Sequence, residues 1–150
     1  MATLAANEPR AYEGGDRNDL PVIGDDIIYE GAAVGVVSGS GLARPLQAGD
    51  KFGGFAKEQA DNTGGAAGAI TVRTQEKGKV KLNVGGAAIT DIDAPIYASD
   101  DNTFTKTATS NTLIGFVHRF VDSGVVIVDY DVAYAKMKAV TEALIAAEHP

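Results

Sequence analysis

The chain has 150 residues, of which 45% are apolar, and this length is typical of one domain with a substantial core. It contains no cysteine, which excludes disulfides, thiolate nucleophiles and cysteine-based zinc sites. Twenty acidic against 13 basic side chains give a net charge of −7, which disfavours nucleic acid and anionic membranes as partners, and neither a secretion signal nor an apolar membrane span is expected.

Residues 1–20 are mostly polar, with little apolar material except Leu4 and Tyr12, and such a segment cannot bury enough surface to fold alone. The sequence therefore predicts an extended N-terminal arm. The arm is either a frayed terminus or a segment that becomes ordered on a partner. In the second case Leu4 and Tyr12 are the expected anchors, with Pro9 and Arg10 as further contacts.

Residues 21–131 contain short apolar runs separated by glycine, aspartate and serine, which predicts a single small β-barrel or β-sandwich domain of about eight or nine strands. The run at 80–84 alternates apolar with polar residues, as a strand with one buried face does. Phe52 and Phe55 flank two glycines, which predicts a bulge or a tight corner. Residues 118–128 predict a hairpin that turns near Gly124.

The stretch at 61–68 is too rich in glycine for regular structure and predicts a mobile loop. A partner that binds this loop would contact Asn62, Gly64 and Gly65.

A change of period marks residues 132–150 as an amphipathic C-terminal helix, with Asp131 as a plausible N-cap. Its apolar stripe is narrow and rich in alanine, so the helix is expected to pack closely on the β domain or on a neighbouring copy. In the second case the subunit contacts are Met137, Val140 and Leu144.

Several acidic pairs, among them Asp91/Asp93 and Asp100/Asp101, could in principle serve general acid–base catalysis or calcium binding. Their spacing does not match a calcium loop, so turn and cap roles are favoured. His118 and His149 are not spaced as metal ligands, and no phosphate-binding loop is present. The sequence therefore predicts no catalytic residue, no metal and no cofactor.

The residues at 48–62, the glycine-rich loop and the segments at 70–73, 80–82, 95–104 and 113–117 occur in an order and spacing that resembles the capsid cement, or decoration, proteins of tailed bacteriophages. The resemblance covers roughly residues 27–129. It implies a β-tulip-like, non-enzymatic virion protein, made in the host cytoplasm, that binds the outside of the expanded head. Its partners would be the major capsid protein and, in a homotrimer, itself.

Two alternatives belong to other classes of protein. A carbohydrate-binding or adhesin-type β module on a virion or cell surface would also be β-rich and acidic. Such modules usually stack sugars on exposed aromatic rings, and this chain has no tryptophan and only five tyrosines. The enzyme alternative is a small hydrolase that uses scattered aspartate and histidine, for example Asp129 and His118.

Overall fold

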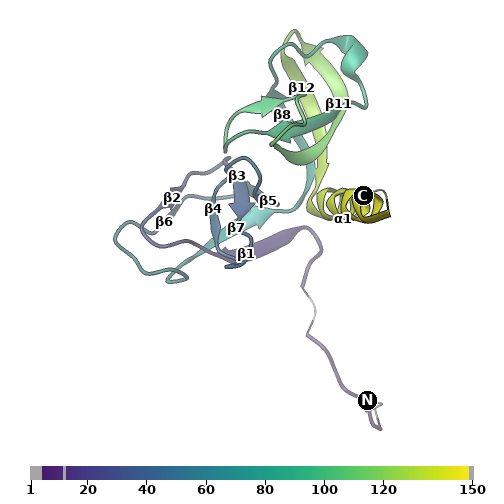
Figure 1. The fold of residues 1–150 in the computed structure, drawn as a ribbon. Coiled ribbons are helices and arrows are strands. Elements are labelled where there is room, and N and C mark those ends of the chain that lie inside the picture. The colour runs from purple at the N-terminus through teal and green to yellow at the C-terminus, as the bar shows by residue number, and fades with distance from the viewer. Residues whose placement is uncertain (1–4, 12, 149–150) are drawn as a thin grey trace.

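The structure, a computed structural model, describes residues 5–11 and 13–148. Within these residues it is mainly β, with one C-terminal helix, as the sequence predicted (Figure 1). The elements in chain order are β1 (Arg17–Pro21), β2 (Ile27–Ile28), β3 (Ala33–Val36), β4 (Ala43–Pro45), β5 (Lys51–Ala56), β6 (Ala60–Asp61), β7 (Thr71–Gln75), β8 (Lys77–Asn83), the 3-10 turn η1 (Ile89–Asp91), β9 (Pro95–Ala98), β10 (Phe104–Thr105), β11 (Thr112–Asp122), β12 (Val125–Asp131) and α1 (Val132–Glu148).

These twelve strands exceed the eight or nine that were expected from the sequence. The difference arises partly because β2, β6 and β10 have only two residues each, and a strand so short carries no alternating pattern. The strands form two five-stranded antiparallel sheets and a two-stranded ribbon, β2-β6, and the sheets curl into a half-barrel.

The first sheet has the strand order β1-β7-β5-β3-β4. Its register shifts where β3 pairs with β5, since Ala33 lies opposite Phe55 whereas Gly35 lies opposite Phe52. The extra residue on β5 falls at the two glycines between the rings, and Gly54 has a φ of 102°, a conformation that favours glycine. The predicted bulge is therefore confirmed.

The second sheet has the strand order β10-β9-β11-β12-β8. The hairpin of β11 and β12 turns at Ser123 and Gly124, as predicted, and Gly124 has a φ of 73°. In β8 the side chain of Leu82 is buried while its neighbours Lys81 and Asn83 are exposed. The half-buried strand expected at 80–84 is thus confirmed.

The two sheets share one core, in which four aromatic rings meet at edge-to-face or tilted angles. Phe55 of the first sheet has its ring centroid 4.9 Å from that of Tyr130 and 6.0 Å from that of Phe104, both in the second sheet. Phe52 completes this group, which we name the aromatic cluster. A second group, the aliphatic cluster, lies against the first sheet and consists of Val22, Ile28, Ala32, Val34, Ala43, Ala56, Ala60 and Val72.

The N-terminal arm is shorter than the sequence indicated. Residues 17–20 were assigned to it, but they form most of β1, which pairs with β7. The physical reason is Leu20, a half-buried side chain that packs against the aliphatic cluster and so anchors the strand. The arm therefore ends at Asp16, whose carbonyl accepts a hydrogen bond from the amide of Glu76.

Candidate interaction surfaces

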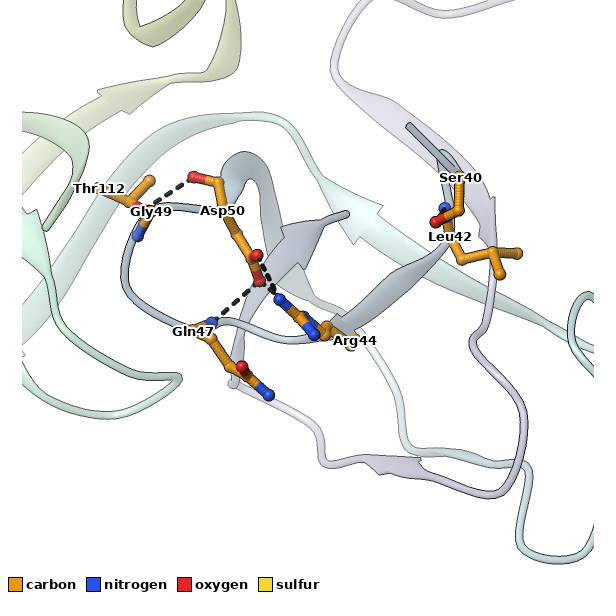
Figure 2. A network of polar contacts seen from close by, with 7 residues as sticks. All are labelled: Ser40, Leu42, Arg44, Gln47, Gly49, Asp50 and Thr112. Carbon is orange, nitrogen blue, oxygen red and sulfur yellow. Dashed lines mark hydrogen bonds and ion pairs between the residues drawn. The ribbon is translucent and has the colours of Figure 1, made fainter. Parts of the chain in front are cut away.

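A partly buried ion pair holds the turn between β4 and β5 (Figure 2). Arg44 donates from Nε and Nη2 to the Asp50 carboxylate, at 3.0 and 2.7 Å, and the amide of Gln47 donates to the same group at 3.0 Å. The side chain of Asp50 is only 6% exposed. Its hydrogen bond raises the pKa of the Arg44 guanidinium, which is therefore a permanent cation here.

The same turn is tied to the second sheet by Thr112 at the start of β11 (Figure 2). The Thr112 hydroxyl donates to the carbonyl of Asp50 at 2.8 Å and accepts from the amide of Gly49 at 3.2 Å. Arg44, Asp50 and Thr112 thus form a polar joint between the two sheets. The charges of Arg44 and Asp50 neutralise each other within the joint. The joint therefore stabilises the fold and offers no free charged group for catalysis.

The glycine-rich loop, residues 62–68, is held by hydrogen bonds to residues far away in the sequence. The Asn62 side chain donates to the carbonyls of Ile23 and Ala66 at 2.9 and 3.0 Å. Across the loop, the amide of Gly64 donates to the Asp25 carboxylate at 2.8 Å, and the amide of Asp25 donates to the carbonyl of Gly65 at 3.1 Å. The loop is therefore ordered, and the prediction of a mobile loop was wrong because glycine content does not reveal such long-range partners.

The three candidate contacts in this loop differ in accessibility. Asn62 is only 3% exposed, so its side chain positions the loop and does not reach a partner. Gly64 is exposed and Gly65 is half-buried, and both remain accessible at the loop surface.

The arm extends away from the rest of the molecule in its described residues, 5–11 and 13–16 (Figure 1). In its described part every residue is exposed, including the predicted contacts Pro9 and Arg10. The other two predicted anchors, Leu4 and Tyr12, lie outside the described residues. The arm thus presents its backbone and side chains to solvent over its whole described length.

The C-terminal helix α1 turns its predicted contact residues away from the β domain. Its N-terminus is capped as expected, since the amide of Ala133 donates to the Asp131 carboxylate at 2.9 Å. Val132 is buried and Ala135 packs against the shared core, so these residues dock the helix. Met137, Val140 and Leu144 are 67%, 60% and 62% exposed. The option that the stripe packs on its own β domain is therefore wrong, and the option of a neighbouring copy stays a prediction.

A groove of about 300 Å³ lies between α1 and the strands beside it. Its floor includes Phe52, Tyr97 and Leu113, and its helical wall includes Lys138 and Glu142, which form an ion pair at 3.7 Å. The groove thus combines an apolar floor with a charged helical wall on which one ion pair is already formed.

One member of each acidic pair named above, Asp91 and Asp100, fills a turn or cap role, as predicted. Asp100 accepts from the amide of Asn102 at 2.9 Å, and this bond lowers its pKa. Asp91 accepts from the amide of Ala88 at 2.8 Å and pairs with Lys106 at 3.0 Å, and both contacts lower its pKa. Within residues 5–11 and 13–148, no group of three or more histidine, aspartate or glutamate side chains is arranged to hold a metal ion.

Two surface residues that the sequence analysis missed adjoin the helical stripe. Tyr134 and Ile145 are 56% and 53% exposed on α1. Tyr134 stands three residues before Met137, and this spacing is a signal that could have identified it. The candidate His118 is exposed on β11, whereas His149 lies outside the described residues.

The search for relatives finds no matching family and no matching curated protein. Over the part of the chain that the structure describes, no helix has both the length and the apolar character needed to cross a membrane. The predicted contacts that are accessible lie on the arm, the glycine-rich loop and the exposed face of α1.

Proposed function

We propose that this protein is a capsid cement protein, which binds the major capsid protein on the outer surface of an expanded tailed-phage head and stabilises the shell as a homotrimer. The observation that carries the proposal is the arm. It extends, fully exposed, from a β domain that has its own core. The order of motifs that resembles cement proteins lies in that β domain, so the two features complement each other.

The physical role follows from the contrast between arm and β domain. A segment without a core of its own gains order only when it binds, which lowers its affinity per contact but lets it wrap over a large surface. Many identical copies on one shell compensate through multivalency, because each additional site in a linked assembly binds at a high effective concentration. The ordered glycine-rich loop supplies a second, preformed contact at Gly64 and Gly65.

The experiment that tests the proposal is co-sedimentation of the purified protein with heads assembled from the major capsid protein of the same genome. We expect saturable binding to expanded heads and none to unexpanded heads. If the protein binds neither form, the proposal fails, and a glycan array would then test the carbohydrate-binding alternative.

The contribution of the arm is tested by deletion of residues 2–15, which leaves β1 and its pairing with β7 intact. We expect head binding to weaken at least about tenfold, or about 1.4 kcal/mol, because the arm contacts are lost. The thermal midpoint should not change, since the described residues of the deleted segment, 5–11 and 13–15, are all exposed. The matched control replaces exposed apolar residues elsewhere, Ile89→Ser and Ile92→Ser on and after η1. Undiminished binding of the deletion variant would remove the arm from the proposal.

A further inference from the structure

The exposed apolar side chains of this protein are concentrated on one helix. Among the described residues nine large apolar side chains are exposed, and five of them lie on α1: Tyr134, Met137, Val140, Leu144 and Ile145. Contiguous apolar surface of this kind on a soluble chain marks an interaction site. The other side of α1 docks on the β domain, and no described residue covers the exposed face, which is therefore available to a partner from outside the chain.

The spacing of this face matches a coiled coil. We define the seam as five exposed residues whose positions are separated by four, three, four and three: Ala133, Met137, Val140, Leu144 and Ala147. This is the alternation of d and a positions in a heptad, with Met137 and Leu144 at a and Val140 at d. All five positions are uncharged, so a second seam of the same kind can approach without burying a charge.

The opposite side of α1 faces the β domain. Ala135 and Glu142 occupy f positions, about 170° around the helix from the middle of the seam at about 100° per residue. Ala135 packs against the shared core, and Glu142 lines the groove between α1 and the strands. The β domain and the Asp131 cap therefore hold the helix in place before any partner arrives, which removes the nucleation cost that makes short isolated helices marginal.

We propose that α1 joins the same helix of two other copies in a parallel three-helix bundle, with the seam at its centre and the three β domains outside. In parallel coiled coils a β-branched residue at a with leucine at d favours dimers, whereas leucine at a with a β-branched residue at d favours trimers or tetramers. Here the order is the second, with Leu144 and the unbranched Met137 at a and the β-branched Val140 at d. The number three rests on the homotrimer of the proposed function, and three copies related by a threefold axis must run parallel.

The first test is the mass of the purified protein, measured by light scattering over a dilution series without heads. We expect three times the mass of one chain. The double variant Met137→Glu with Leu144→Glu should fall to the mass of one chain, because six charges would meet at the axis. The matched control Ile145→Glu adds a charge at an exposed apolar residue outside the seam and should stay trimeric. Any other mass for the natural chain, or a trimeric double variant, overturns the proposal.

The second test is the direction of the helices. The chain has no cysteine, so a single introduced thiol is the only one present. Ala133→Cys and Ala147→Cys place it at the two ends of the seam. In a parallel bundle each variant alone is joined to itself by a short thiol cross-linker, whereas antiparallel helices are joined only when the two variants are mixed. Circular dichroism of each variant checks that the β domain is folded.

The outcomes separate this inference from the proposed function. A stable parallel trimer that binds no heads would overturn the cement function and leave the bundle standing. A chain that binds expanded heads but is not trimeric through α1 would overturn the bundle alone.

Discussion

The aromatic and aliphatic clusters both fill the space between packed strands, but they do so with side chains of different size. In the aromatic cluster, large rings such as Phe55 and Tyr130 fill the space between two sheets and contact each other edge to face. In the aliphatic cluster, small residues such as Ala60 and Ala32 let the ribbon β2-β6 and its loops approach the first sheet closely. The comparison teaches that aromatic rings bridge the two sheets within the larger core, whereas the ribbon is held to the first sheet by a smaller cluster of aliphatic side chains alone.

The largest expected effect is therefore on the aromatic cluster. Phe55→Ala should lower the free energy of unfolding by about 3–5 kcal/mol, because it removes a ring that touches both sheets and leaves a cavity. Ile28→Val in the aliphatic cluster, where the side chain is fully buried, should cost only about 1 kcal/mol. Urea unfolding of both variants checks the difference, and equal costs would show that the sheets do not depend on the rings.

The polar joint beside the aromatic cluster gives the next effect. Asp50→Asn keeps the shape of the side chain but leaves the Arg44 charge without its partner. Removing one member of a fully buried ion pair costs about 3–5 kcal/mol, and because Arg44 is partly exposed we expect about 2 kcal/mol here. Asp19→Asn, which breaks the exposed pair with Arg73, is the control and should change the unfolding midpoint little. A similar loss in both variants would contradict the role of burial.

The smallest effect concerns pH and has opposite signs at two aspartates, Asp61 and Asp101. Asp61, in the ribbon, has its pKa lowered by hydrogen bonds from Thr63, so its stabilisation is present above the unfolded pKa and is lost as pH falls through the folded pKa. Asp101, in the turn between β9 and β10, has its pKa raised by burial and by the charge of Asp100. Its carboxylate therefore destabilises the fold once pH has risen above the folded pKa.

Replacing each aspartate with neutral asparagine should show whether its charge stabilises or destabilises the fold. At pH 7 we expect a lower thermal midpoint for Asp61→Asn and a higher one for Asp101→Asn than for the natural chain. The Asp101 difference should shrink as pH falls through its raised folded pKa toward about 4, the pKa of an unperturbed aspartate, whereas the Asp61 difference should shrink only as pH falls below about 4. Melting curves between pH 3 and 7 provide the measurement, and a shift of the same sign in both variants would show that the local environments do not govern it.

Local features of this protein followed directly from its sequence. The glycines at 53 and 54 predicted the bulge in β5, the alternation of Leu82 with lysine and asparagine predicted the half-buried strand, and Asp131 predicted the helix cap. Each of these depends on backbone conformations or side-chain contacts within a few residues, and the local sequence determines such preferences.

The sequence by itself determined the mainly β class, the hairpin of β11 and β12 and the C-terminal helix, because each depends on a short-range pattern. Only the tertiary structure decided which partners those elements meet. The Asn62 side chain donates to the carbonyls of Ile23 and Ala66. Leu20 packs on the aliphatic cluster, so residues 17–20 belong to β1 and not to the arm. Ala135 docks α1 on the core, so Leu144 faces solvent. These outcomes depend on contacts between residues distant in the chain, and the periodicity of a single segment does not contain them.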